Sequence, residues 1–295
     1  MKKVAVAACI FALFGAGQSD LAKAAGAVRA PGACALDLAD PVPARPARAR
    51  SGSAFVAEIE RLAGPARDAA VAEQVLGGNV PDFLRQLTPV TLRWTPPGDA
   101  PVDVTICVTP DYLAVGSDSD FVRTPMGLPA ASVVAERLGF MLPTTKMVDA
   151  IYAQADVRLA PSPMPPTSAM ETTNYFWRHN STVEDQRGRT AGDRAALTAG
   201  QKKDIVLSNR LRSKPGRVAI YGWHRPNGKP IQPLSTVHGE HYADYSHGVR
   251  LVSMTAYVNG EPRRLADILQ DPRLAASVNS EGPIPQLERL LLSLR

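Results

Sequence analysis

The sequence predicts an α+β fold, with a helix-rich N-terminal half and a mainly antiparallel sheet in the second half. Three observations support this prediction. Segments with helical spacing of apolar residues are concentrated before residue 160. Runs of β-forming residues, separated by Gly, Asn and Pro turn signals, recur after it. Strands and helices do not alternate regularly, so a doubly wound parallel sheet is not expected.

Two helices and a set of strands are expected at the start of the globular part. Residues 53–63 and 67–76 carry helical spacing of apolar side chains. TPVTLRW at 88–94 and VDVTICVTP at 102–110 alternate as strands, and the segment between them is rich in turn residues. YLAVGS at 112–117 indicates a third strand.

Two further helices precede a change in composition. Pro129 and Pro143 each begin a segment with an apolar stripe, and proline is favoured in the first turn of a helix. Residues 161–166 then form a proline-rich connector. We expect it to separate a helical and β-hairpin part at 53–160 from a mainly β part at 167–295.

The second half begins with a polar helix at 171–189 and continues as strands. The β-type runs at 204–211 and 217–224 are separated by a turn that contains proline and glycine. VRLVSMTAYV at 249–258 is another strand, and the Asn-Gly pair after it marks a tight hairpin turn. The chain from Leu265 onward is helical but broken by prolines.

The first residues predict export. Lys2 and Lys3 precede an apolar run that ends near Gly17, and an A-x-A site ends at Ala24. This pattern is typical of a secretory signal peptide at residues 1–24. The apolar run is shorter than the ~20 residues that a membrane-spanning helix needs. The protein is therefore expected to be secreted or periplasmic after cleavage near Ala24.

Residues 25–52 are rich in Ala, Pro and Arg and have no apolar period, so we expect a flexible leader. Cleavage of the signal peptide leaves Cys34 and Cys107. In an oxidising compartment these two residues can form one disulfide. The alternative is that Cys107, within an apolar run, is simply a small buried hydrophobe.

Composition narrows the choice of partners. The full chain has a formal net charge of +5, and residues 1–24 contain three lysines and one aspartate, so the mature chain carries about +3. This mild charge is compatible with a polyanion such as peptidoglycan or an acidic glycan. We expect no nucleic-acid partner, because no basic run is interleaved with aromatic residues. We also expect no membrane span in the mature chain.

The stretch HGEHYADYSHGVRL at 238–251 contains three of the five histidines. Gly239 and Gly248 bracket it, which favours a loop leading into a strand. Reactive groups are often mounted on loops held by a rigid sheet. With one histidine from the strand RVAIYGWH, the candidate catalytic residues are His224, His238, Asp244, Tyr245, Ser246, His247 and Arg250.

Two established chemistries use side chains of the types found in this stretch. A zinc site would use His238, His247 and either Asp244 or His241, but the spacing does not match the HExxH signature. A serine nucleophile at Ser246 would fit the later part of a G-x-S-x-G elbow, but an aspartate replaces the first glycine. The sequence therefore assigns no cofactor, and zinc stays an open hypothesis.

Two local resemblances extend this comparison. SHGVRL at 246–251 resembles the S-H-G-C-(I/V)-R-L block of L,D-transpeptidases, which act on peptidoglycan through a cysteine. The cysteine position is absent here and the arginine follows one residue early, so the resemblance implies no thiol chemistry. The block from 222–234 through 241–252 also resembles an uncharacterised family of secreted bacterial proteins, which implies no activity.

Acid–base chemistry needs neither metal nor cysteine. A histidine oriented by Asp244 can exchange protons near neutral pH, Tyr245 or Tyr242 can donate one, and Arg250 or Lys229 can hold a carboxylate or an oxyanion. This set of groups suits amide or ester hydrolysis and also β-elimination in an acidic polysaccharide. Trp223 and Tyr221 would then form a wall for sugar stacking.

These observations leave three functional hypotheses. The first is a hydrolase of a cell-envelope or extracellular polymer, with peptidoglycan as the first substrate to consider. The second is a polysaccharide lyase that uses His, Tyr and Arg. The third is a non-enzymatic periplasmic binding or scaffold protein in which the loop is structural and His247 is buried. Lys202 and Asp204 are interpreted as a solvated entry to a strand.

Overall fold

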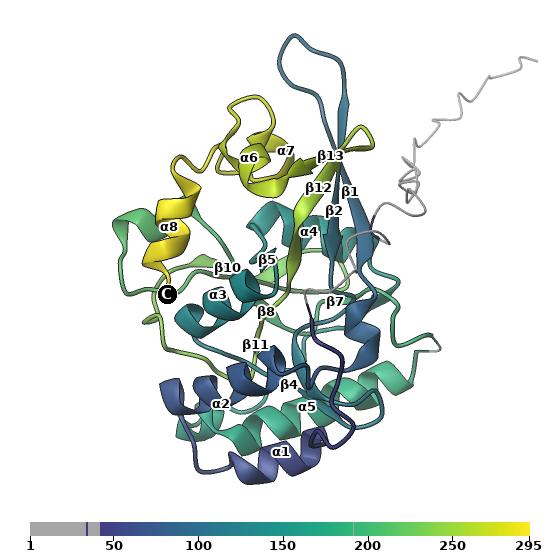
Figure 1. Ribbon diagram of the computed structural model, residues 1–295, viewed down its shortest axis with the longest axis vertical. Helices are drawn as coiled ribbons and strands as arrows, with labels where there is room; N and C mark the ends of the chain where they lie inside the picture. Colours follow the sequence, from purple (N-terminus) through teal and green to yellow (C-terminus); the bar gives the residue numbers. More distant parts are fainter. Residues whose placement is uncertain (1–33, 35–41, 191) are drawn as a thin grey trace, which may run out of the picture.

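A computed structural model describes residue 34, residues 42–190 and residues 192–295, and shows a mixed α+β fold (Figure 1). The largest sheet is antiparallel and is built from both halves of the chain. Strand β2 (Val102–Val108) lies between β1 (Thr88–Trp94) and β12 (Val252–Val258). β12 also pairs with β13 (Glu261–Arg264) and with β5 (Phe140–Met141).

The second sheet carries most of the candidate residues. Its strands follow the order β10 (Pro230–Ser235), β9 (Ile220–His224), β8 (Lys203–Ile205) and β11 (His247–Gly248). The first three strands are antiparallel, but β11 pairs with β8 in parallel. Apart from this one pair the sheet is antiparallel, in agreement with the mainly antiparallel sheet predicted for the second half.

Two short pairs complete the strands. β3 (Ala114–Gly116) and β4 (Phe121–Arg123) form an antiparallel hairpin. β6 (Val157–Arg158) and β7 (Thr198–Ala199) pair in parallel and bring together segments on either side of helix α5 (Thr173–Gly188).

The helices begin where local sequence favours them. Ser51 and Thr144 accept a hydrogen bond from the first turns of α1 and α4, and Pro65 and Pro129 occupy the first turns of α2 and α3. Figure 1 shows α1, α2 and α5 together at one end of the molecule. The bounds are α1 (Gly52–Glu58), α2 (Gly64–Leu76), α3 (Leu128–Arg137), α4 (Thr145–Gln154), α6 (Leu265–Gln270), α7 (Ala275–Val278) and α8 (Leu287–Ser293), with 3-10 turns η1 (Asp82–Arg85), η2 (Ser168–Glu171) and η3 (Asn209–Ser213).

The α+β class predicted from the sequence is confirmed, but its finer division is not. Helices α1–α4 precede residue 160 and α5–α8 follow it, so helices are not confined to the N-terminal half. The parts at 53–160 and 167–295 also share the largest sheet and one hydrophobic core that extends from Phe55 to Leu294. The connector at 161–166 crosses the surface without separating two cores.

The leader is partly fixed to the fold. Cys34 and Cys107 form a disulfide with Cα atoms 5.5 Å apart, so the bonded alternative is the one observed. Arg45 donates hydrogen bonds to Asn79 and to the carbonyl oxygen of Gly116, both at 3.0 Å. Arg45 therefore attaches this end of the leader to the fold, although most residues from 43 to 50 are exposed. The expected signal peptide at 1–24 lies outside the described residues, and no helix within the described ranges is long and apolar enough to cross a membrane.

Candidate functional site

The histidine-rich loop at 238–251 points mostly into the protein. His238 and Tyr242 are partly exposed and His241 is exposed, but every residue from Ala243 to Leu251 is buried. Gly248 lies against Tyr112, because a Cβ atom at position 248 would stand only 2.5 Å from the tyrosine ring. The glycine of the S-H-G stretch is thus required by packing.

Asp244 organises the buried part of the loop. One carboxylate oxygen accepts hydrogen bonds from the backbone amide of Ser246 at 2.7 Å and from its hydroxyl at 2.5 Å. The other accepts from the Tyr242 hydroxyl at 3.0 Å. Burial raises the pKa of this carboxyl, but the His247 ring, the Ser246 hydrogen bonds and Lys203 outweigh it and lower the pKa to about 2. Asp244 is therefore ionised at neutral pH.

His247 has a relative exposure of 0%. Its Nε2 atom lies 3.9 Å from Asp244 Oδ2, too far for a hydrogen bond, and neither ring nitrogen has a hydrogen-bond partner among the residues described. Burial lowers the pKa of His247 to about 4, although Asp244 opposes the shift. The ring is neutral at pH 7 and packs edge-to-face against Tyr242, with centroids 5.6 Å apart.

Arg250 is also completely buried, and it joins separate segments of the fold. Its guanidinium donates to the carbonyl oxygen of Thr109 at 2.8 Å and to that of Thr198 at 2.7 Å, and lies over the Tyr112 ring at 4.3 Å. The Tyr112 hydroxyl in turn donates to Asp204 at 2.9 Å. Arg250 therefore satisfies main-chain oxygens and is not presented to solvent.

Lys202 and Asp204 are buried, so their interpretation as a solvated strand entry is wrong. The Lys202 ammonium donates to the carbonyl oxygen of Tyr245 at 2.5 Å and lies 3.1 Å from Nδ1 of His179. Burial, helped by the charge of Arg123, lowers the pKa of Lys202 to about 7. Burial also raises the pKa of Asp204 to about 6, against the effects of Arg250 and Tyr112.

Tyr245 is part of an aromatic cluster beneath the proline-rich connector. Its ring contacts Tyr175, His179 and Trp223, and its hydroxyl exchanges hydrogen bonds with the backbone of Met164. Trp223 is only 5% exposed. The expected sugar-stacking wall is therefore wrong for Trp223, which packs in the core.

His224 makes its contacts away from the loop. Its Nε2 atom lies 2.8 Å from Asp149 of helix α4, and its ring stacks on Tyr152 at 4.6 Å. Tyr221 donates its hydroxyl hydrogen to the same Asp149 oxygen at 2.9 Å. These contacts hold β9 against α4. Strand β8 lies between β9 and β11, so His224 and His247 are on strands that are not neighbours.

His238 and Tyr242 form the solvent-facing edge of the loop. Their rings stack in parallel with centroids 4.0 Å apart. The carbonyl oxygen of His238 accepts a hydrogen bond from Val218 at 3.2 Å. His241 turns away toward Glu240, with His241 Nε2 3.7 Å from a carboxylate oxygen. The three histidines of the loop therefore have three different environments.

The residues of the loop form neither a metal site nor a serine nucleophile paired with a histidine. Within the described ranges, no group of three or more His, Cys, Asp or Glu side chains could hold a metal ion. Asp244 stands between Ser246 and His247, whereas a serine nucleophile needs the histidine next to the serine. Val249 is buried where the transpeptidase block leads to a cysteine, and both Cys34 and Cys107 are in the disulfide.

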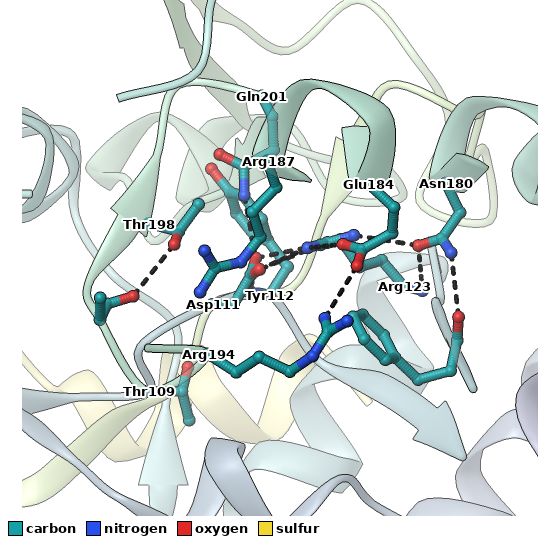
Figure 2. Close-up of polar contacts among 12 residues, drawn as sticks. Thr109, Asp111, Tyr112, Arg123, Asn180, Glu184, Arg187, Arg194, Thr198 and Gln201 are labelled. Carbon is teal, nitrogen blue, oxygen red and sulfur yellow. Dashed lines mark hydrogen bonds and ion pairs between the residues drawn. The ribbon is translucent and has the colours of Figure 1, made fainter. Parts of the chain in front are cut away.

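A buried ionic network was not anticipated from the sequence. Arg123 donates to Asp111 at 2.6 Å and to Glu184 at 2.9 Å, and Arg194 donates to the other oxygen of Glu184 at 2.8 Å. Figure 2 shows how these side chains converge. Asn180 accepts from Arg123, and its amide donates to the backbone of Phe121. Burial opposes the charge on Asp111, but the Arg123 guanidinium outweighs it and lowers the pKa of this carboxyl. The network fixes helix α5 to strand β4.

A cavity of about 320 Å³ lies beside the loop and was also missed. The walls come from the turn at 211–217, from Glu240 and from helix α8. We call it the cationic cleft, because its lining includes Arg212, Lys214, Arg217 and Arg289. The basic run RLRSKPGR was visible in the sequence, but nothing local indicated that residue 289 returns to the same place.

Comparison with protein-family models, with curated proteins and with solved structures gives no match to this chain. The two local resemblances therefore stay predictions.

Proposed function

We propose that the protein is an exported, non-enzymatic binding protein that attaches to a polymer of the cell envelope or the extracellular space. The burial of the reactive part of the loop carries this proposal. Asp244, Ser246, His247 and Arg250 have relative exposures of 0–2%, and a polymer can react only with groups that it can touch.

The contacts of these residues account for their presence without catalysis. Asp244 shapes the turn through Ser246, and Arg250 donates to two buried carbonyl oxygens from separate segments of the chain. Polar side chains in such positions stabilise one backbone conformation. The loop thereby supports the second sheet and the surface beside it.

Export is part of the proposal. Disulfides persist in oxidising compartments, and the Cys34–Cys107 bond connects the leader to the central strand β2. The pattern of residues 1–24 indicates a secretory signal. An exported protein encounters the polymers of the cell envelope and the extracellular space, and such a polymer is the ligand that we propose.

The second candidate is an enzyme, and the edge formed by His238 and Tyr242 favours it. Asp244 holds the tyrosine, the tyrosine ring stacks on the histidine, and histidine exchanges protons near neutral pH. In a hydrolase of peptidoglycan, His238 would take a proton from water. In a polysaccharide lyase it would take the proton next to a uronate carboxylate while the glycosidic C–O bond breaks.

Incubation with peptidoglycan and with polygalacturonate separates these functions. We expect the protein to co-sediment with or bind one polymer, to release no soluble fragments, and to form no ultraviolet-absorbing unsaturated product. His247→Ala should lower the melting temperature while the folded fraction keeps binding, and His241→Ala, an exposed control, should change neither. If wild-type protein forms products and His238→Ala does not, the protein is an enzyme and the binding proposal is wrong.

A further inference from the structure

We infer that the cationic cleft binds the carboxylate groups of an acidic glycan. The inference rests on the proposed binding function and names the class of polymer. The cleft adjoins the histidine-rich loop, because Arg217 pairs with Gly239 in an isolated β-bridge and the backbone amide of Glu240 donates to Gly216 at 3.0 Å. A ligand in the cleft therefore lies beside the exposed edge of the loop.

The charges of the cleft are not neutralised by the protein. Arg212, Lys214, Arg217 and Arg289 are exposed, and none of them forms an ion pair with another described residue. Glu240 is the carboxylate in the lining, and it faces His241. Four cations around one acidic side chain produce a local positive field that attracts a polyanion.

Two of the cations are held in place before any ligand binds. Arg217 donates to the carbonyl oxygen of Val237 at 2.7 Å, and Arg212 donates to that of Pro285. A guanidinium with one edge tethered keeps further N–H donors for a carboxylate, and a fixed side chain loses less entropy on binding. The cleft is thus partly preorganised for anions.

The remaining lining fits a sugar better than a simple anion. Leu211, Leu290 and Leu294 are buried and give the cleft an apolar side, which can contact the C–H face of a sugar ring. Gln286 and Ser293 add an amide and a hydroxyl for sugar hydroxyls. Gln286 has a left-handed backbone conformation with φ of 49°, an uncommon conformation that often accompanies functional sites. The volume of about 320 Å³ lies within the range of ligand pockets, ~300–1,000 Å³.

The experiment is calorimetric titration of the purified protein with tetragalacturonate, with its methyl ester and with a short polyglutamate peptide. The test variant is Lys214→Gln/Arg289→Gln, since neither side chain makes a hydrogen bond or ion pair with another described residue and folding should be unaffected. The control is Arg225→Gln/Arg263→Gln, which removes the same charge from exposed positions outside the cleft.

We expect tetragalacturonate to bind, salt to weaken the binding, and the test variant to bind about ten-fold more weakly or worse. The control variant should stay within about two-fold of the wild type. Absence of binding, equal binding of the methyl ester, stronger binding of polyglutamate, or equal losses in both variants would each overturn the inference. None of these outcomes decides whether the protein cleaves a polymer, because that is read from product release.

Discussion

Tyr242 donates its hydroxyl hydrogen to Asp244 at 3.0 Å, and this bond joins the exposed edge of the histidine-rich loop to its buried part. The tyrosine also stacks on His238 and contacts the edge of the His247 ring. Three residues that look like parts of a catalytic site are therefore linked through one aromatic ring. The relative positions of these residues therefore depend on the Asp244 carboxylate, which holds the Tyr242 ring in place.

Asp244→Ala should destabilise the protein by about 3 kcal/mol. The substitution leaves the buried amide and hydroxyl of Ser246 without their acceptor, and unpaired buried donors are costly; the partly exposed Tyr242 hydroxyl loses its acceptor too. Urea unfolding followed by circular dichroism measures the change. His241→Ala, at an exposed position of the same loop, should stay within about 0.5 kcal/mol of the wild type. Equal stability of the two variants would contradict the role given to Asp244.

Gly248→Ala should be poorly tolerated, and Gly239→Ala should be close to neutral. A methyl group at position 248 would stand 2.5 Å from the Tyr112 ring, which is buried beneath Arg250. Overpacking of this kind costs about 1–3 kcal/mol. At position 239 the nearest atom is 4.0 Å away. Thermal unfolding of both variants is the measurement, and a smaller loss at position 248 than at 239 would refute the packing argument.

Acid should destabilise the protein through its buried histidines. Burial lowers the pKa of His247 to about 4 and, with Lys202, that of His179 to about 2, against about 6.5 in the unfolded chain. Between about pH 6.5 and 4 the unfolded chain binds protons that the folded chain does not, so stability falls as the pH falls. Each histidine contributes at most about 1.4 kcal/mol per pH unit.

Asp204 opposes part of this acid effect. Its pKa is raised to about 6, so the folded chain takes up a proton between about pH 6 and 4 that the unfolded chain binds only at lower pH. Between about pH 6 and 4 the net loss should therefore approach that of a single histidine rather than two. His247→Gln should reduce the slope of unfolding free energy against pH by about 1.4 kcal/mol per unit. An unchanged slope would show that His247 titrates normally in the folded protein.

Reduction of the disulfide should lower stability by about 4 kcal/mol, because the bond closes a loop between residues 73 positions apart. Comparison of melting temperatures with and without dithiothreitol tests this expectation. Cys34→Ala/Cys107→Ala should match the reduced wild type and should not respond to the reductant. A response in that variant would mean that the reductant acts elsewhere.

Local patterns were enough to predict much of the secondary structure. The run TPVTLRW corresponds to β1 at Thr88–Trp94, and the Asn-Gly pair forms the turn between β12 and β13. Register and sheet order were less accessible. β12 pairs with β2 across roughly 150 residues of sequence, and no local signal encodes that pairing. No local pattern therefore indicated that the parts on either side of the connector share one sheet.

The sequence identified the residues of the candidate site, but it did not indicate that most of them are buried. Histidine, aspartate and serine have the same sequence signature in a catalytic loop and in a polar turn that shapes the backbone. Which applies depends on what covers the loop, and here Tyr112 and the segment near Met164 come from distant positions. Likewise, the β3–β4 hairpin brings Arg123 back to Asp111, but Asn180 and Glu184 reach the same arginine from helix α5, about sixty residues along the chain.

The Arg123–Asp111 pair gives a test that separates charge from volume. Arg123 and Asp111 are 1–2% exposed. Arg123→Met keeps most of the volume but leaves the buried Asp111 charge without its ion-pair partner, which should cost about 3 kcal/mol. Asp111→Asn removes that charge while an amide oxygen still accepts from Tyr112 and Gln201. The double variant should therefore recover about 2 kcal/mol relative to Arg123→Met alone. Urea unfolding of the four proteins gives the coupling energy. If the two losses simply add, the pair is not coupled, and the stability of the α5–β4 contact must come from Asn180 and the apolar packing around it.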